Sequence, residues 1–379
     1  MKLLMTADTV GGVWSYALEL ASALAPRGVE ITIATMGAPL SDVQWREARA
    51  LGKAMKGMMS SVDVVESTYR LEWMPEPWDD LEAAGDWLLG LAHALRPDLV
   101  HLNGYVHAAL GWNAPTCVVA HSCVLSWWRA VKGELAPAEW SLYRQAVSAG
   151  LRAADVVVAP SRAMLNALEL EYGPLPGARV IYNGRDAAQF PSSAKEPFVL
   201  SAGRVWDEAK NVAALDQAAP MLDWPVCIAG DAQPPGDPLA DGFHYKVSAR
   251  YLGRLDSTEL AEWMARASIY ALPARYEPFG LSVLEAALAG CALVLGDIPS
   301  LREIWGGAAL FVPPGDSAKL RSTISELIGN DTLRGRVADA CRLRALEFNT
   351  DSMADGYMVA YDDALHAAPS ESRREACAS

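Results

Sequence analysis

The segment SIYALPARYEPFGLSVLEAALAGCALVLG, residues 268–296, holds a strand, a turn, a helix and a second strand in that order. SIYALP and CALVLG are short apolar runs of the kind that forms strands buried on both faces of a parallel sheet. Between them, GLSVLEAALAG carries Leu281, Leu284 and Leu288 at the spacing of one helix face. A strand, a helix and another strand in succession predict an α/β fold.

The same alternation extends through the rest of the chain. The runs 198–203, 225–230 and 247–253 lie before the segment, and the N-terminal half holds further runs at 2–6, 29–36, 98–103, 116–121, 155–160 and 178–183. Residues 184–197, GRDAAQFPSSAKEP, show no sustained period and are the predicted linker. We therefore expect two Rossmann-like, doubly wound parallel-sheet domains, 1–185 and 196–350, with a helix at about 351–368 packing back.

Length and composition narrow the class of protein. A chain of 379 residues suits two domains, and a net charge of -14 argues against a nucleic-acid partner. The apolar stretch in the first residues, MKLLMTADTVGG, is shorter than the core of a signal peptide. The six cysteines are scattered along the sequence, which favours reduced thiols. These features predict a cytoplasmic protein. The sequence has no Asp-x-Asp pair and no His/Cys cluster, so we expect neither a metal nor another cofactor.

Two cations follow a predicted buried strand in SAGRVWDEAKN, residues 201–211. Arg204 and Lys210 stand where open α/β sheets collect ligands, and together they could neutralise a diphosphate. In the opening segment, Glu277 precedes a turn and Glu285 lies about one and a half turns into the helix that Gly280 begins. Carboxylates accept hydrogen bonds from sugar hydroxyls, and the free amides of a helix N-terminus hold phosphate oxygens.

Other candidates have a structural explanation of similar weight. Gly11 and Gly12 follow the first strand, where they would let a ligand approach the backbone or would only form a tight turn. Trp14 would shape acceptor choice or fill the core. Trp127 and Trp128 could stack on an acceptor sugar, although packing explains tryptophans equally well.

Residues 41–59 predict a basic amphipathic helix. Such a helix could make weak peripheral contact with an anionic membrane at the inner face, but a surface helix with its apolar stripe on the core is the favoured interpretation. Its basic residues share one face: Arg46, Arg49, Lys53 and Lys56.

Several of these motifs resemble those of one enzyme family. EPFGLSVLE, residues 277–285, resembles the Glu-x7-Glu element of retaining GT-B glycosyltransferases, especially those of family 4. SAGRVWDEAKN resembles the family's Gly-Arg…Lys-Asn element, and GGVWSYALELASAL, residues 11–24, its first glycine-rich loop and helix. VVVAPSRAML and VIYNGRD resemble the end of its N-terminal domain. The resemblance implies two domains that face a central cleft.

The resemblance also implies roles for individual residues. Arg204 and Lys210 would bind the donor pyrophosphate and stabilise it as a leaving group, while Glu277 would hold the transferred sugar and Glu285 the nucleotide ribose. His121, at the end of the run 116–121, matches the family histidine beside the donor sugar; from the residue alone, a packed histidine is the more natural interpretation. Backbone amides would hold sugar and phosphate at Phe279, Gly280 and Leu281, and Gly12 would face the diphosphate.

The activity implied is metal-independent transfer of a sugar from a nucleotide-sugar to a glycan, lipid or small-molecule hydroxyl, as in polysaccharide biosynthesis. UDP is the preferred nucleotide by family frequency, with GDP and ADP as alternatives. A noncatalytic sugar-nucleotide-binding protein, a GT-B epimerase and a phosphorylase remain alternatives. A nicotinamide-dependent oxidoreductase fits poorly, because no G-x-G-x-x-G follows either first strand.

Overall fold

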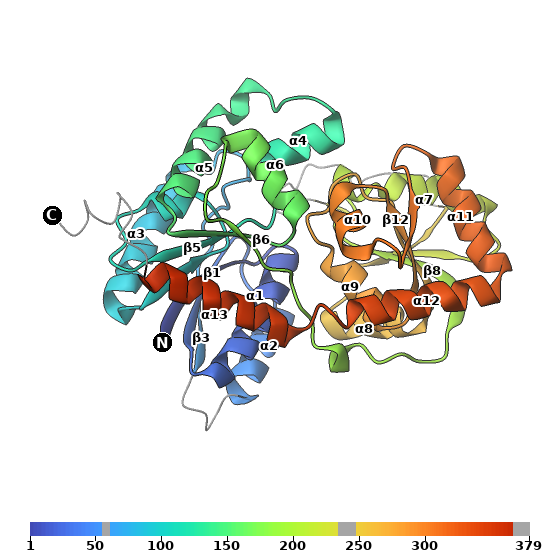
Figure 1. Cartoon of the computed structure of the whole chain (residues 1–379), viewed down its shortest axis with the longest axis horizontal. Coiled ribbons are helices and arrows are strands. Elements are labelled where there is room, and N and C mark those ends of the chain that lie inside the picture. The colour runs from blue at the N-terminus through green and yellow to red at the C-terminus, as the bar shows by residue number, and fades with distance from the viewer. Residues whose placement is uncertain (55–60, 234–247, 367–379) are drawn as a thin grey trace. The chain divides into compact units, whose positions relative to one another are not determined.

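The computed structural model describes residues 1–54, 61–233 and 248–366, and the chain divides into two compact units. The first comprises Met1–Arg129, Glu134–Gly184 and the chain from Thr350 onward, and the second comprises Ala130–Gly133 and Arg185–Asn349. Each unit contains its own parallel sheet flanked by helices (Figure 1). The expected α/β class with two Rossmann-like domains is confirmed.

The first unit is built on a seven-stranded sheet in the order β3-β2-β1-β4-β5-β6-β7. Neighbouring strands are parallel throughout, so their carboxyl ends lie along one edge. The strands are β1 (Lys2–Asp8), β2 (Glu30–Met36), β3 (Val62–Glu66), β4 (Leu99–Leu102), β5 (Thr116–Val119), β6 (Val156–Ala159) and β7 (Arg179–Val180). The central strands β4, β5 and β6 are buried along their length, as their apolar runs predict.

Helices connect these strands and cover the sheet. They are α1 (Gly12–Leu24), α2 (Asp42–Ala54), α3 (Trp78–Leu95), α4 (Val124–Lys132), α5 (Ser141–Ala153) and α6 (Arg162–Tyr172). A further helix, α13 (Thr350–His366), comes from the far end of the sequence and packs against α1, β5 and β6 (Figure 1). Residues 367 and 368, which the prediction included in this helix, lie outside the described part of the chain.

The second unit has a six-stranded sheet in the order β10-β9-β8-β11-β12-β13, again with parallel neighbours. Its strands are β8 (Glu196–Ala202), β9 (Val226–Ala229), β10 (Arg250–Gly253), β11 (Ala267–Leu272), β12 (Ala292–Gly296) and β13 (Leu310–Val312). Its described α-helices are α7 (Val212–Ala218), α8 (Ser257–Arg266), α9 (Leu281–Leu288), α10 (Pro299–Trp305), α11 (Ser317–Gly329) and α12 (Asp331–Ala345), and its 3-10 helices are η4 (Ala187–Gln189), η5 (Glu208–Lys210) and η6 (Ala219–Met221).

A close backbone contact shapes the carboxyl edge of this second sheet. Gly230 follows β9 with φ of 139°, and a Cβ atom built on it would lie 1.8 Å from the carbonyl oxygen of Gly203, the residue after β8. No side chain fits that space, so only glycine allows the ends of β8 and β9 to come together. The loop that carries Arg204 therefore starts from a fixed point.

The five cysteines within the described residues are all buried and form no disulfide with one another, in line with the expectation of reduced thiols: Cys117, Cys123, Cys227, Cys291 and Cys341. Burial raises the pKa of the Cys117 thiol to about 12 and that of Cys291 to about 11, which keeps both protonated and unreactive. Cys377 lies outside the described residues.

Candidate functional site

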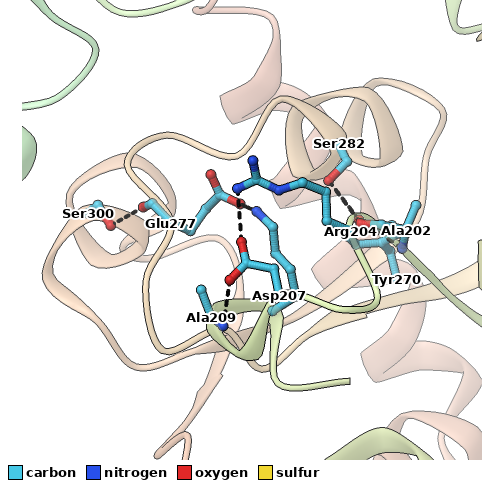
Figure 2. A network of polar contacts seen from close by, with 9 residues as sticks. Ala202, Arg204, Asp207, Ala209, Tyr270, Glu277, Ser282 and Ser300 are labelled. Carbon is cyan, nitrogen blue, oxygen red and sulfur yellow. Dashed lines mark hydrogen bonds and ion pairs between the residues drawn. The ribbon is translucent and has the colours of Figure 1, made fainter. Parts of the chain in front are cut away.

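Arg204 and Lys210 lie just beyond the carboxyl end of β8 and are each paired with a carboxylate. Lys210 Nζ is 2.5 Å from Oε2 of Glu277, and Arg204 Nη2 is 2.8 Å from Oδ2 of Asp207. Figure 2 shows the side chains of Arg204 and Asp207, from the loop after β8, converging with that of Glu277 from the loop after β11. The structure thus brings three of the predicted residues together and adds Asp207, which sequence reasoning missed.

These charges are largely withdrawn from water. The side chains of Lys210 and Glu277 are 15% and 11% exposed, while that of Arg204 is 36% exposed and stacks 5.3 Å from the ring centre of Trp206. Partly buried charges are stable only when they are paired. An anion that entered here would therefore meet two cations whose present partners are carboxylates of the protein itself.

Hydrogen bonds to backbone carbonyls hold the two loops of this cluster together. Asn211 adopts a left-handed conformation (φ 54°), and its Nδ2 donates to the carbonyl oxygens of Pro273 at 2.9 Å and Pro314 at 2.8 Å. The backbone amide of Arg275 donates to the carbonyl of Ala209 at 2.8 Å. The loop after β8 is consequently tied to the loop after β11, and these bonds help to hold Lys210 beside Glu277.

Glu277 is also fixed from the opposite side. Ser300, at the start of α10, donates from its Oγ to the backbone carbonyl of Glu277 at 2.5 Å (Figure 2). Behind the cluster, the hydroxyl of Tyr270 donates to the carbonyl of Ala202 at 3.0 Å and lies 2.8 Å from Oγ of Ser282. These contacts tie the ends of β8 and β11 to the first turn of α9.

The N-terminus of α9 opens beside this cluster, as the sequence predicts. Gly280 is its N-cap with φ of 92° and no side-chain cap, and the first helical hydrogen bonds are donated by Val283 and Leu284 to the Gly280 carbonyl. The backbone N–H of Leu281 lies before the first of these donors, so it is one of the N–H groups at the positive end of the helix that have no acceptor within the helix. Phe279 is buried and packs edge-to-face on Phe348, so its side chain anchors the turn.

Glu285 is not an exposed helix residue but half of a buried ion pair. Its Oε1 accepts from Nε of Arg185 at 2.9 Å and also pairs with Nη2, and both side chains are only 10% exposed. Arg185 was not among the residues predicted for the site. A ribose that reached Glu285 would share the carboxylate with this guanidinium.

In the first unit, His121 follows β5 and belongs to a polar group in which His101 is buried and His121 and Asn103 are partly buried. Its Nε2 lies 2.8 Å from Oδ1 of Asn103, which also lies 3.1 Å from Nε2 of His101. Burial and the neighbouring His101 lower the pKa of His121 to about 3, and burial lowers that of His101 to about 4. Both imidazoles are therefore neutral at physiological pH.

His121 and Asn103 line a pocket at the carboxyl ends of β1, β4 and β5. Glu72 also lines it, with Oε2 accepting from the backbone amides of Tyr105 and Val106 at 3.0 Å each. Burial raises the pKa of Glu72 to about 7 in spite of these two hydrogen bonds. A pocket with apolar walls and a few polar groups, at this edge of a parallel sheet, is suited to a small hydroxylated ligand.

The other predicted positions of the first unit differ in exposure. Gly11 (φ 93°) and Gly12 are exposed at the start of α1. Trp14 is 3% exposed, and its Nε1 donates to Glu47 at 2.8 Å. The structure therefore supports the core-filling interpretation of Trp14.

Trp127 and Trp128 are half-buried on α4 and contact each other edge-to-face at 5.8 Å. Their partial exposure leaves room for a flat ligand on either ring. A role of this pair in acceptor binding stays a prediction.

The predicted basic helix is observed as α2 up to its described end. Ala48 is buried in a small cluster with Trp14 and Leu40, whereas Arg46 and Arg49 are exposed. This is the arrangement of a surface helix with its apolar stripe on the core. Lys56 lies outside the described residues, and both the membrane contact and the cytoplasmic location stay predictions.

The described residues lack two features, one for metal binding and one for crossing a membrane. In residues 1–54, 61–233 and 248–366, no group of three or more His, Cys, Asp or Glu side chains is arranged to hold a metal ion. Over the same ranges, no helix combines the length and the apolar character needed to cross a bilayer. Metal independence remains a prediction.

Both halves of the chain match known families. Residues 10–189 match the family described as Glycosyltransferase Family 4, and residues 196–330 match Glycosyl transferases group 1. The glycogen synthase of Mycobacterium tuberculosis is 28% identical over 366 residues, which cover 88% of this chain and 86% of that protein. The phosphatidyl-myo-inositol mannosyltransferase of Mycolicibacterium smegmatis is 26% identical over 354 residues, covering 88% and 85%.

Solved structures share the fold. The sucrose-phosphate synthase of Thermosynechococcus elongatus aligns with a TM-score of 0.75 at 19% identity, over 96% of this chain and 98% of that one. HepE from Anabaena, in complex with UDP-glucose, aligns with a TM-score of 0.73 at 19% identity, over 96% and 99%. With both halves matched by glycosyltransferase families and the fold shared along nearly its whole length, this chain belongs to the family 4 GT-B glycosyltransferases.

Proposed function

We propose that this enzyme transfers a sugar from a UDP-linked donor to a hydroxyl of a glycan, lipid or small molecule, with retention of anomeric configuration and without a divalent metal. One observation carries the proposal. Arg204 and Lys210 are fixed side by side at the carboxyl edge of the second sheet, next to the open N-terminus of α9. Two fixed cations and a helix end supply the positive charge that a diphosphate needs.

The comparisons support a nucleotide-sugar donor and favour UDP. HepE, with a TM-score of 0.73, was solved with UDP-glucose, and the relatives named above are a glycogen synthase and a mannosyltransferase. GDP- and ADP-sugars are the alternative donors in this proposal. The acceptor is a hydroxyl compound of unidentified structure.

The chemistry follows from where charge develops. The bond from the anomeric carbon to the phosphate oxygen breaks, the bond to the acceptor oxygen forms on the same face, and the acceptor proton passes to the departing phosphate. Negative charge grows on the diphosphate, where Arg204 and Lys210 stabilise it, and such preorganised charges supply the largest share of many catalytic effects. Glu277, released in part from Lys210 by the incoming phosphate, then accepts hydrogen bonds from the sugar.

Thermal-shift measurements with UDP-, GDP- and ADP-sugars are the first test, because a bound donor raises the melting temperature by mass action. The selected donor is then incubated with candidate acceptors in EDTA, and the anomeric configuration of the product is read by NMR. A rise in melting temperature without turnover would indicate a noncatalytic binding protein. Conversion of the donor without an acceptor would indicate an epimerase, and loss of turnover in EDTA would refute metal independence.

A further inference from the structure

The polar group around His121 carries an inference about how that histidine is held. Asn103 lies between the two histidines, one residue beyond β4. Its Nδ2 donates to the backbone carbonyl of Thr6 at 2.7 Å, and its backbone amide donates to Oγ1 of the same residue at 2.9 Å. Because Nδ2 faces Thr6, Oδ1 must be the atom that faces the imidazoles.

The identity of that atom decides the tautomer of both rings. An amide oxygen only accepts hydrogen bonds, so Nε2 of His121 at 2.8 Å and Nε2 of His101 at 3.1 Å must both carry a hydrogen. Both rings are neutral, so each leaves Nδ1 as an acceptor. For His101 that acceptor receives the hydroxyl hydrogen of Tyr361, 2.7 Å away on α13.

For His121 the consequence concerns the pocket that its ring lines. With Nε2–H bound to Asn103, the Nδ1 lone pair can accept a hydrogen bond from a ligand hydroxyl but cannot donate one. The edge of Tyr16 on α1 packs at 4.5 Å between ring centres, which holds the imidazole plane. The ring therefore has one fixed tautomer and one fixed orientation.

We infer that Asn103 and Tyr361 are positioning residues, which hold His121 as the Nε2–H tautomer so that its Nδ1 accepts a hydrogen bond from a substrate hydroxyl. This inference rests on the proposed function for the substrate, but the tautomer itself is a property of the protein alone. Tyr361 acts through His101 and Asn103, so a helix near the end of the sequence helps to set the chemistry of a loop near residue 121.

The test reads the tautomer directly. Long-range 1H–15N correlation spectra of the 15N-histidine-labelled protein, without ligand at neutral pH, should show His121 and His101 as neutral Nε2–H tautomers, with assignments from His121→Gln and His101→Gln variants. A protonated His121, or one with the hydrogen on Nδ1, would overturn the inference whether or not the protein transfers sugars.

Variants then connect the tautomer with activity. Asn103→Ala should give a mixture of tautomers for His121 and lower kcat roughly tenfold, the equivalent of about one hydrogen bond, with a smaller change in donor KM. Tyr361→Phe should perturb the His101 signals first and lower kcat less. Tyr357→Phe is the matched control, because Tyr357 lies on the same helix with its ring 5.4 Å from that of His101, yet no described hydrogen bond joins it to either histidine.

Folding of each variant is checked by its melting temperature. A folded Asn103→Ala protein with the wild-type tautomer and wild-type kcat would refute the positioning role. A shifted tautomer with unchanged kcat would separate the two claims and refute the use of Nδ1 by substrate. If even the wild-type protein transfers no sugar, the proposed function fails while the spectra still decide the tautomer.

Discussion

The two sheets end in polar clusters of opposite kinds. In the first unit, His101, Asn103 and His121 are neutral and joined by hydrogen bonds. In the second, Lys210 and Arg204 are charged and each is held by a carboxylate. Neutral groups can be buried once their hydrogen bonds are satisfied, whereas charges need a counter-charge. The side chains of the first cluster are therefore held in place by their mutual hydrogen bonds. In the second cluster, an anionic ligand can take the place of the carboxylates that now pair with Lys210 and Arg204.

Removal of a cation from the second cluster should have the largest effect. Lys210→Ala should lower kcat about 100- to 1000-fold, because one preorganised charge on the leaving group is lost. Steady-state transfer assays measure this, with the exposed Lys319→Ala as the charge-matched control. Turnover of Lys210→Ala at the wild-type rate would show that Lys210 has no role in the mechanism. It would also refute the claim that the second cluster acts through its charges.

The buried pair at Glu285 should make the next largest contribution, and to stability. Glu285→Ala leaves the Arg185 guanidinium buried without its carboxylate, which should destabilise the second unit by about 3 kcal/mol. The double variant Arg185→Leu/Glu285→Leu should recover most of that loss. Urea unfolding measures both. Asp297→Ala, which breaks the more exposed pair with Arg302, should change the free energy of unfolding far less.

Acidification should act on the first unit, through its neutral histidines. The folded pKa values of His101 and His121 lie below the unfolded value near 6.5, so the unfolded chain binds more protons from about pH 6.5 down to about 4 for His101 and about 3 for His121. The contribution of these neutral rings to the free energy of unfolding is therefore fully present above pH 6.5. It is lost as the pH falls, by at most about 1.4 kcal/mol per pH unit for each ring. Burial lowers the pKa of His107 in the same direction.

Glu72 opposes this trend. Its folded pKa of about 7 exceeds the unfolded 4.5, so its contribution is present below pH 4.5 and is lost as pH rises to 7. Glu72→Gln should therefore make the acid-induced loss of stability steeper. Urea unfolding at pH 7, 6 and 5 provides the measurement, and equal slopes for the variant and the wild type would contradict a protonated Glu72 in the folded protein.

The smallest effect is expected behind Glu277. Ser300→Ala removes one hydrogen bond to the Glu277 carbonyl, worth about 1 kcal/mol, and should lower kcat by less than about tenfold. The matched control is Ser322→Ala on α11, whose hydroxyl hydrogen-bonds within its own helix. If Ser300→Ala lowered kcat as much as Lys210→Ala, the position of Glu277, and not charge alone, would determine turnover at the second cluster.

The fold was predictable because the apolar periodicity of a strand or a helix involves only residues that are close together in the sequence. Alternating apolar runs and the Pro and Gly residues that bound them predict both sheets, and the motif around Glu277 predicts the turn before α9. Local pattern also predicts Lys210 and Glu277 as site residues, since each follows a buried strand of a parallel sheet.

The partners of these residues were not predictable in the same way. Arg185 and Glu285 are 100 residues apart, and Tyr361 lies 260 residues from His101. No spacing rule connects such pairs, because they meet only once the sheets and helices are packed. His101 did leave a signal, namely a polar residue within a run of four buried strand positions, and such a residue must find a hydrogen-bond partner.

The return of α13 to the first unit has a consequence for synthesis on the ribosome. Residues 185–349 are translated in one continuous stretch and hold a complete sheet, whereas the earlier sheet lacks Tyr361 and the packing of α13 until the second has been made. Polypeptides are made at about 5–20 residues per second, so the first-made unit waits roughly 10 to 40 seconds with an apolar face uncovered. The half of the enzyme that is translated first is the last to mature.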